Sequence, residues 1–450
     1  MYLVHIGFDD IDSPFGGCTT DLVSQLVVDW VRRDGIRFID YPNLIRLCPA
    51  VPWKTRGNGS VVLRLHVREI DIGVELFEEA VARAYDYVVH FRHPESHPAV
   101  VLYVGRVTDR LRWLGRKAVQ DIVPIDLVDR LISKLGDRVR VERLCGRRGV
   151  IGALAGIGYT MEDTDYTYEL IAYRREDYWG SPRKIDPISV REMDKMLRGE
   201  TFLNYDYEID RPLIAPHGPD PVLFGIRGES PEALVKALEI IRVEEPITRW
   251  VLYRTNQATD AHLKRINSLG EAYIYTGIIF RGRVSKPPRR IRGGHVIFGI
   301  TDGAQEIDVA AYEPTGGFRN IVGKLWIGDL VEIYGVVRPQ SSYHGPTVNL
   351  EKLRVIEVAS RIVYEAPKCP RCGKRMKSMG RGKGYRCPRC GFRDPKAKKI
   401  AREIPRDLRP GFYQPPPRAF KHLMKPIERF GREKKRFLGV LYGRWYGVSS

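Results

Sequence analysis

The 450-residue chain has no run of about 18 consecutive apolar residues, so the sequence predicts no transmembrane helix. Asp9 and Asp10 stand where a secretory signal peptide needs an apolar stretch. Cysteine is scarce, because only seven are present: Cys18, Cys48 and Cys145 are scattered, and the other four are clustered. We therefore expect a soluble, cytoplasmic protein without a disulfide framework.

Acidic residues are scarce in the last fifth of the chain. Residues 361–450 hold 26 lysines and arginines against 6 acidic residues, a net charge of +20, whereas the first 360 residues carry a net charge of −1. A basic segment of this kind binds polyanions by neutralising phosphates. An acidic membrane surface is the alternative, but Pro405 and Pro410 break any long amphipathic helix. The charge pattern favours nucleic acid as the partner.

An acidic motif follows the first apolar segment. Residues 1–8 mix β-branched, aromatic and apolar side chains, which predicts a buried strand. This strand delivers Asp9, Asp10 and Asp12 to its carboxyl end, where close carboxylates repel one another unless a cation lies between them. Mg²⁺ suits such a site, because it combines one or two protein oxygens with water and phosphate. The alternative is an acidic turn that caps a helix beginning near Thr20.

Several glycine-containing segments are candidate phosphate-binding turns. Gly16 and Gly17 allow the backbone to approach a ligand closely. In residues 53–59, Trp-Lys-Thr-Arg-Gly-Asn-Gly, backbone amides can cradle phosphates while the two cations offset charge, although a plain hairpin turn fits equally. Residues 146–152, Gly-Arg-Arg-Gly-x-x-Gly, resemble another such turn, but their glycines also permit close helix packing.

The middle of the chain, residues 141–268, alternates helical and strand patterns. This alternation is typical of a two-layer α+β domain of the ferredoxin-like type. Asp163, Asp165 and Glu169 form a second acidic group there. The group is compatible with a bound cation or polyamine, and equally with helix capping or surface solvation.

Residues 269–360 have an all-β pattern, which predicts a small Greek-key barrel of the OB type. The basic residues after the first strand are expected in a long loop, where such barrels bind single-stranded nucleic acid. An ordinary barrel with solvated basic loops is the alternative. The strands are expected at residues 272–279, 295–300, 307–312, 330–337 and 347–350, and the loop residues are Arg281, Arg283, Lys286, Arg289, Arg290 and Arg292.

Two Cys-Pro-Arg-Cys-Gly motifs lie in residues 361–395. Each motif brings two thiolates to one point, and two motifs complete a tetrahedral zinc site, whereas a redox dithiol normally comes as one motif inside a βαβ unit. The surrounding basic residues, with Tyr385 available for stacking, suit RNA. The basic and aromatic tail, residues 396–450, is compatible with docking on RNA and equally with packing on the protein. The predicted zinc ligands are Cys369, Cys372, Cys387 and Cys390.

Taken together and in order, these motifs resemble the archaeal tRNA 2-agmatinylcytidine synthetase family. The resemblance covers nearly the whole chain, because the barrel and the cysteine motifs follow in the family's order. It departs at Phe8 and Ile11, where the family usually has isoleucine and threonine, so no ligand role is assigned to residue 11. The matching segments are residues 7–13, 18–20, 45–47, 54–59 and 168–174.

The resemblance implies a multidomain α+β enzyme that uses ATP, Mg²⁺ and Zn²⁺. Such an enzyme attaches agmatine to the wobble cytidine of the isoleucine tRNA with a CAU anticodon. The rival hypothesis, a non-catalytic single-stranded nucleic-acid-binding protein, leaves the acidic motif unexplained. The implied parts are a kinase-like α/β N-terminal domain (1–140), a ferredoxin-like domain (141–268), an OB-fold β-barrel (269–360), a zinc ribbon (361–395) and the basic tail (396–450).

The resemblance also implies roles for individual residues. Thr19 would be the threonine that becomes autophosphorylated, and Lys54 and Arg56 would offset charge during phosphoryl transfer. The remaining implied roles are Mg²⁺ binding by Asp9, Asp10 and Asp12, nucleotide contacts by Gly16, Gly17, Thr20, Gly57 and Asn58, and recognition of the agmatine guanidinium by Asp163, Asp165 or Glu169.

Overall fold

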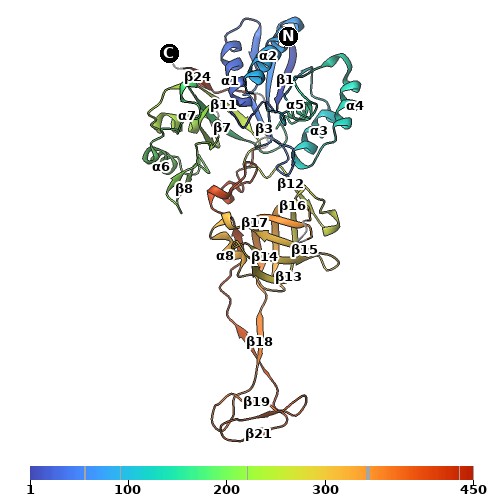
Figure 1. Cartoon of the computed structure of the whole chain (residues 1–450), viewed down its shortest axis with the longest axis vertical. Coiled ribbons are helices and arrows are strands. Elements are labelled where there is room, and N and C mark those ends of the chain that lie inside the picture. Colours follow the sequence, from blue (N-terminus) through green and yellow to red (C-terminus); the bar gives the residue numbers. More distant parts are fainter. Residues whose placement is uncertain (55–56, 92, 220, 341–344, 435, 449–450) are drawn as a thin grey trace.

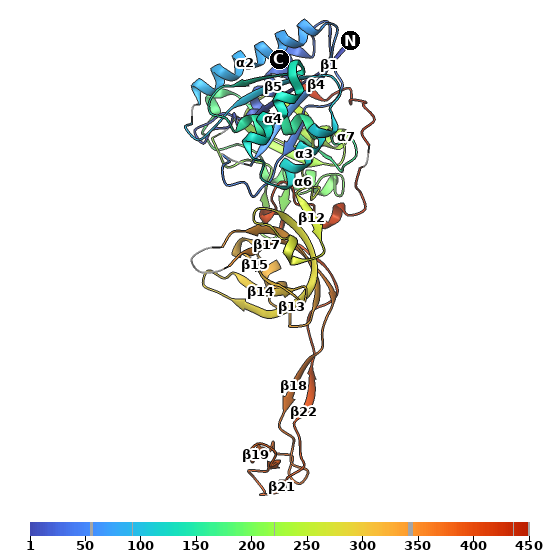
Figure 2. The same ribbon diagram turned by 90° about the vertical axis from the view of Figure 1, so that its right-hand side faces the viewer.

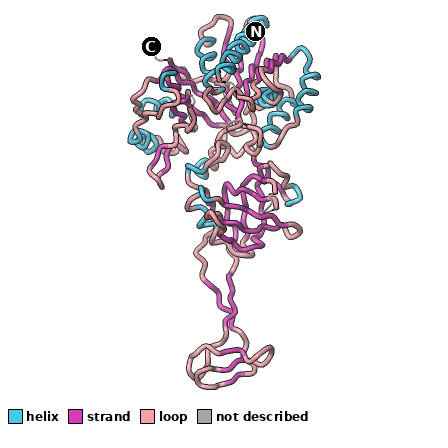
Figure 3. Tube along the Cα trace, in the orientation of Figure 1, coloured by secondary structure: helices cyan, strands magenta, loops and turns pink. Residues whose placement is uncertain are grey.

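The computed structural model describes residues 1–450 except residues 55–56, 92, 220, 341–344, 435 and 449–450. Three parts follow one another along its long axis (Figure 1): an α/β body (residues 1–262 and the end of the tail), a β-barrel, and a small cysteine-containing ribbon on a two-stranded arm. Helices are concentrated in the α/β body, whereas the arm and ribbon consist of strands and loops (Figure 3). Among the described residues, no helix is long and apolar enough to cross a membrane.

One ten-stranded sheet spans the whole α/β body. Its halves meet where the end of β11 (Ile247–Thr255) pairs in parallel with β3 (Asn43–Arg46). The segments expected as separate domains, residues 1–140 and 141–268, therefore share a continuous sheet. Its other strands are β10 (Val222–Gly228), β7 (Thr167–Arg174), β4 (Gly59–Val67), β1 (Tyr2–Asp9), β5 (Ala99–Val104), β6 (Val139–Arg143), β2 (Ile36–Phe38) and β24 (Tyr446–Val448).

β1 is apolar and buried over most of its length, as predicted, and its side chains alternate between two helical layers. Val4 contacts Gly73 of α2 (Ile70–His90), whereas Gly7 lies against α5 (Gly149–Gly158). A β-carbon at Gly7 would lie 2.4 Å from a carbonyl oxygen of α5, so glycine lets this helix approach the sheet. The other α-helices of the described chain are α1 (Thr19–Trp30), α3 (Asp109–Gln120), α4 (Ile125–Leu135), α6 (Pro187–Met196), α7 (Pro231–Ile240) and α8 (Phe318–Val322).

The alternation predicted for residues 141–268 is confirmed by α5, β7, α6, β10, α7 and β11 in order. The first elements of this range nevertheless pack on the first half of the sheet, because β6 pairs with β5 and α5 contacts β1. The second half places α7 against β7 and β10, and a short ribbon of β8 (Tyr205–Asp206) and β9 (Arg211–Pro212) lies outside the main sheet.

The barrel has its main strands near the predicted positions, but the first strand is much longer than expected. β13 runs over Gly277–Arg290, so the expected loop is wrong: five of its six basic residues lie in the strand and Arg292 follows it. The alternating Arg-Gly-Arg-Val pattern satisfies the two-residue period of a strand, and register shifts on both sides of Lys286 let it bend. The barrel closes through β14 (Val296–Thr301), β15 (Glu306–Ala311), β17 (Thr347–Glu357) and β16 (Leu330–Arg338), which pairs back to β13; β12 (Leu263–Ile266) and β23 (Gly411–Tyr413) extend it.

The arm consists of β18 (Arg361–Glu365) and β22 (Ile400–Ile404), which pair antiparallel. Its far end carries the cysteine ribbon, built on three very short strands. The prediction that Tyr385 is available for stacking is wrong, because its side chain is buried among Met376 and the cysteines. The ribbon strands are β19 (Lys377–Ser378), β20 (Tyr385–Arg386) and β21 (Arg393–Asp394).

The tail returns from the arm and packs on the protein (Figure 2). Arg406 pairs with Asp329 of the barrel, and Arg418 pairs with Asp206 of the α/β body. Trp445 is buried in the main core, and β24 then joins the large sheet beside β11. Of the two alternatives for the tail, packing on the protein holds for its described part.

Candidate active site

The acidic motif lies at the carboxyl end of β1, as predicted, but its carboxylates have different surroundings. Burial, together with the nearby Asp10 and Asp12, raises the pKa of Asp9 well above its usual value. The Oδ2 atom of Asp9 lies 2.0 Å from the point that a β-carbon at Gly152 would occupy. Asp10 has a left-handed backbone (φ 58°), and its Oδ2 accepts a hydrogen bond of 2.6 Å from the backbone N–H of His97.

Asp12 connects the acidic motif to the start of α1. Its Oδ1 accepts hydrogen bonds from the backbone N–H of Thr19, at 2.7 Å, and from the Thr19 hydroxyl, at 3.3 Å. Asp12 therefore caps the start of α1, as the alternative interpretation of the acidic motif proposed. It also lines the cavity described below. The contact holds a buried hydroxyl against a carboxylate that can accept its proton.

The segment before α1 is fixed by glycines and tyrosines. Gly16 and Gly17 have positive φ values, and a β-carbon at either position would lie within 3.0 Å of the ring of the phenylalanine that ends α2. The hydroxyls of Tyr173 and Tyr253 each donate a hydrogen bond of 2.9 Å to the carbonyl oxygen of Thr20. These predicted nucleotide-contacting residues therefore shape the turn beside the acidic motif, but they do not line the cavity.

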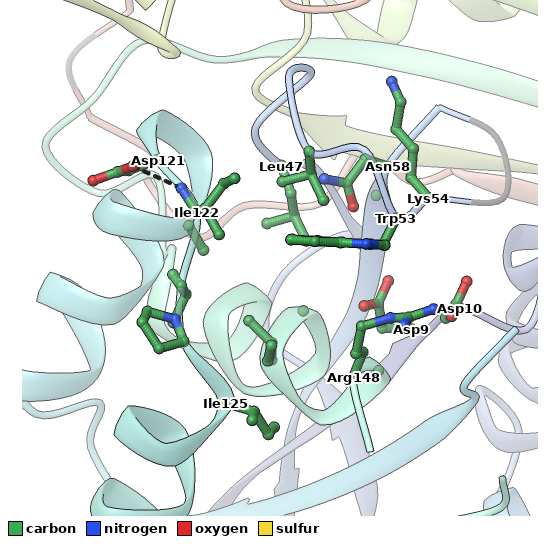
Figure 4. Close-up of a pocket in the computed structure, with 18 of the residues that line it drawn as sticks. Asp9, Asp10, Leu47, Trp53, Lys54, Asn58, Asp121, Ile122, Ile125 and Arg148 are labelled. Atoms are coloured by element: carbon green, nitrogen blue, oxygen red, sulfur yellow. Dashed lines mark hydrogen bonds between the residues drawn. The ribbon is translucent and has the colours of Figure 1, made fainter. Parts of the chain in front are cut away.

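The three aspartates open into a cavity of about 440 Å³. In Figure 4, Asp9 and Asp10 lie on one side with Arg148, and Ile122 and Ile125 lie on the other. Trp53, which is 59% exposed, lies beside the carboxylates. The cavity thus combines charged groups that suit phosphates with an apolar wall that suits a flat ring. The wall is formed by Leu47, Val51, Ala118, Ile122, Val123, Pro124, Ile125 and Ile151.

The predicted phosphate-binding segment forms one rim of this cavity, through Lys54 and Asn58. The Nζ of Lys54 donates a hydrogen bond of 2.9 Å to the carbonyl oxygen of Pro49, and burial together with neighbouring cations lowers its pKa. The side-chain amide of Asn58 donates to a backbone carbonyl at 2.8 Å, which orders the loop. Arg56, a predicted catalytic residue, lies outside the described residues.

The cavity residues Trp53, Arg148 and Gly149 were not among the predicted site residues. The last two mark the start of α5, so the N-terminus of this helix faces the cavity. A β-carbon at Gly149 would lie 2.0 Å from the carbonyl oxygen of His97, which explains the glycine. The predicted glycine turn at residues 146–152 includes Arg148 and Gly149. Trp53 begins the predicted segment 53–59, although an indole side chain is not a phosphate ligand.

The carboxylates predicted to hold agmatine lie in three different environments. Asp163 is exposed, and within the described part of the chain its side chain makes no hydrogen bond or ion pair. Asp165 pairs with the tail through Arg429, whose Nη1 lies 3.0 Å from Asp165 Oδ2. Glu169 is buried and accepts a hydrogen bond from the side-chain amide of Gln257.

A tail histidine completes this network beside the predicted nucleotide loop. His422 Nδ1 lies 2.9 Å from Gln257 Oε1. Because the amide of Gln257 donates to Glu169, its oxygen is the acceptor and His422 Nδ1 carries the proton. Burial and the nearby Arg46 hold the pKa of His422 well below its usual range, so its Nε2 is unprotonated. That atom faces Gly57, where a β-carbon would lie 2.9 Å away.

The four clustered cysteines converge at the end of the ribbon. Their sulfur atoms lie within 4.8 Å of one another, with 3.5 Å between Cys369 and Cys390 and 3.4 Å between Cys372 and Cys387. Backbone N–H groups lower the pKa of the Cys387 thiol to about 6, which favours a thiolate ligand. Within the described ranges, no other group of three or more His, Cys, Asp or Glu ligand atoms converges in this way. The donor set fits zinc.

Comparisons with known proteins connect both sites to one family. Family models match over residues 5–144 (TiaS TCKD domain), 147–262 (TiaS FLD domain) and 366–408 (TiaS C-terminal zinc ribbon domain). The isoleucine-tRNA 2-agmatinylcytidine synthetase TiaS of Staphylothermus marinus is 57% identical over 437 residues, covering 97% of this chain and 95% of that protein. Its counterpart from Methanocaldococcus jannaschii is 39% identical over 439 residues, covering 95% and 99%.

Solved structures match over the same length. The crystal structure of a complex of TiaS with isoleucine tRNA and ATP has a TM-score of 0.84 and 37% identity, covering 95% of this chain and 98% of that chain. The complex of TiaS with isoleucine tRNA, AMPCPP and agmatine has a TM-score of 0.81 and 35% identity, with coverage of 95% and 98%. The chain therefore belongs to the TiaS family of isoleucine-tRNA 2-agmatinylcytidine synthetases.

Proposed function

We propose that the protein joins agmatine to the 2-carbon of the wobble cytidine of the isoleucine tRNA with a CAU anticodon, using ATP and giving 2-agmatinylcytidine. It would thus be a ligase that forms a carbon–nitrogen bond. The observation that carries this proposal is the cavity in which three aspartates face Lys54, Arg148 and an apolar wall, in a chain with full-length TiaS relatives. A non-catalytic nucleic-acid-binding protein would leave this cavity without a role.

The proposal assigns a task to each part of the chain. Residues 1–140 act as the kinase-like domain and residues 141–268 as the ferredoxin-like domain. The barrel of residues 269–360 acts as an OB-fold, and residues 361–395 act as a zinc ribbon that Cys369 and its three partners hold together. The barrel and ribbon grip the tRNA at a distance while its wobble base leaves the stack and enters the α/β body.

The chemistry explains why ATP is required. The 2-oxo group of cytosine is a poor leaving group until a phosphoryl group is transferred from ATP to its oxygen. The amine nitrogen of agmatine then attacks C2, and the oxygen departs as inorganic phosphate. The protein contributes by orienting the reactants and by stabilising charge that develops during transfer.

The cavity residues suit these tasks. Lys54, Arg148 and the positive end of the α5 dipole favour phosphates, and the apolar wall accepts the base of ATP. Mg²⁺ would be held by one or two of the three aspartates, because the buried Asp9 has a raised pKa that a cation would relieve and the three carboxylates do not converge as the cysteines do. Bound Mg²⁺ would offset the charge of the phosphate oxygens.

We propose Thr19 as the phosphoryl acceptor and Asp12 as its base. The Thr19 hydroxyl lies 3.3 Å from Asp12 Oδ1, so Asp12 can take the proton as the oxygen attacks. For agmatine, Asp163, Asp165 and Glu169 remain the proposed carboxylates. Asp163 is the one that can bind the guanidinium without displacing a partner among the described residues.

The test is a transfer assay with the purified protein, Mg²⁺, ATP, labelled agmatine and CAU-anticodon isoleucine tRNA. After digestion of the RNA, we expect the label on cytidine, and only when ATP is present. Transfer to a tRNA whose wobble base is uridine serves as the negative control. Folded, zinc-loaded protein that binds the tRNA but transfers no label would contradict the proposal.

A further inference from the structure

A second cavity lies far from the active site, at the base of the arm. Its volume is about 240 Å³, and its walls come from the barrel at Pro287 and Trp326 and from the arm at Arg361 and Pro405. Figure 1 places this junction between the barrel and the cysteine ribbon. The cavity therefore lies between these two parts.

Three cationic side chains line this cavity, and among the described residues Arg361 is the one without a polar partner. Its guanidinium carbon lies over the Trp326 ring, 4.1 Å from the ring centroid, in a cation–π contact. The Nε atom of Arg361 is buried and has no hydrogen-bond partner, and the side chain forms no ion pair with any described residue. Because Arg361 lines the cavity and has no carboxylate partner among the described residues, its positive charge is available to an anion there.

The other two cations of the cavity are already engaged. The Nη2 of Arg406 donates to Asp329 Oδ2 at 2.7 Å, and the Nζ of Lys324 lies 2.6 Å from Asp407 Oδ2. Asp407 is almost fully exposed, so its pair with Lys324 is weak and easily exchanged. Arg361 and Lys324 can therefore serve an anion together, while Arg406 holds the cavity wall.

The geometry of the arginine and the volume of the cavity indicate which kind of anion fits. A stacked arginine presents its N–H groups as a rigid planar fork, which matches two oxygens of a phosphate. The volume is below the roughly 300–1,000 Å³ of pockets for drug-sized ligands, so a phosphate with its ribose fits better than a nucleoside triphosphate. The proline and tryptophan walls suit the apolar face of the ribose.

We propose that this cavity binds one backbone phosphate of the tRNA, held by Arg361 and supported by Lys324. The identity of the ligand as tRNA rests on the proposed function. Exposed basic residues of the ribbon, such as Arg371 and Arg381, lie beyond the arm, so an RNA strand held by both barrel and ribbon would run along the arm whose base carries this cavity. The competing possibility is that Arg361 only fixes the arm by stacking on Trp326.

Three variants of the full-length protein separate these roles: R361A removes charge and stacking, R361Q keeps a flat group over Trp326 without charge, and R361K keeps charge. We expect the Kd for CAU-anticodon isoleucine tRNA to rise about tenfold in R361A and R361Q. The slope of log Kd against log salt concentration should fall by about one in both, as for the loss of a single phosphate contact. R361K should keep the slope of the wild type.

The control is R402A, on the same arm but outside the cavity, where Arg402 pairs with Glu365 at 3.5 Å. It should bind tRNA like the wild type. Wild-type binding by R361Q would overturn the inference, because stacking alone would then suffice, and so would an equal loss in R402A. Failure of the wild type itself to bind this tRNA would instead overturn the proposed function, and this inference with it.

Discussion

The α/β body and the cysteine ribbon hold their charged residues in opposite ways. In the body, tail cations are paired with carboxylates inside the protein: Arg429, with its side chain 1% exposed, contacts both Asp165 and Glu229. In the ribbon, basic side chains such as Arg371, Lys383 and Arg389 are exposed. The positive excess of the last fifth of the sequence is therefore divided, because part of it fastens the tail and part of it faces solvent.

The two regions also differ in what keeps them folded. The body has one large apolar core that runs through both halves of its sheet. The ribbon has a small cluster made of two cysteines, Met376 and Tyr385, which is too little apolar surface to fold alone. We infer that the body is stabilised by burial and the ribbon by its metal, so different changes should disable each of them.

The largest expected effect separates catalysis from RNA binding. Asp10→Asn should lower ATP turnover about 100-fold or more, because it removes a proposed Mg²⁺ ligand, and it should leave the proposed RNA-binding surfaces unchanged. Asparagine tolerates the left-handed backbone and can still accept the N–H of His97, so the fold should persist. ATP turnover and tRNA affinity are measured on the same preparation. An equal loss of tRNA affinity in folded protein would argue against a catalytic role.

The next prediction concerns the cysteine ribbon. Cys369→Ser should release zinc and unfold the ribbon, since one of four converging sulfurs is lost. We expect the tRNA affinity to fall about tenfold or more, because several phosphate contacts disappear. ATP binding should persist. Zinc content, tRNA affinity and ATP affinity are the measurements, and full tRNA affinity without zinc would remove the ribbon from the RNA interface.

The third prediction concerns the fastening of the tail. Arg429→Ala should lower the free energy of unfolding of the α/β body by about 2–3 kcal/mol, because Asp165 and Glu229 lose their most buried partner and keep only Lys425 and Lys434. Arg444→Ala is the matched control: its pair with Glu239 is exposed and should contribute less than about 1 kcal/mol. Urea unfolding measures both. Similar small effects would mean that the tail adds little to the body.

Local sequence patterns predicted most helices and strands of the α/β body, but not which strands pair with each other. The pairing of β11 with β3 links residues about 200 positions apart, and no local period reports it. The tail was undecided for the same reason, since the partners of Arg418 and Arg429 lie far away in sequence. The barrel prediction failed at β13, where basic residues on the exposed side of a strand resembled a loop.

The polar part of the candidate site was predictable from sequence motifs. Asp9, Asp10 and Asp12 line the cavity with Lys54 and Asn58, as a motif-based prediction requires. The apolar wall was missed, because such residues occur in every core and become a wall only when the fold leaves a space beside them. Arg56 lies outside the described residues, so its role remains a prediction.

The smallest expected effect comes from Asp9 itself. Burial raises the pKa of Asp9 above the ordinary 3.8, so the folded protein keeps a proton that the unfolded chain releases. The free energy of unfolding should therefore fall as the pH rises above about 4 towards the raised pKa, unless a cation is bound.

Asp9→Asn removes this cost, because asparagine does not ionise. Without divalent cations, the variant should be more stable than the wild type at pH 7 by more than about 1 kcal/mol, and the difference should shrink as the pH approaches 4. Urea unfolding across this pH range, with and without Mg²⁺, measures it. Mg²⁺ should stabilise the wild type and not the variant, since only a carboxylate at this position attracts the cation. Parallel stability curves for the two proteins would mean that the charge of Asp9 is already balanced within the chain, and the cation assignment would lose its electrostatic basis.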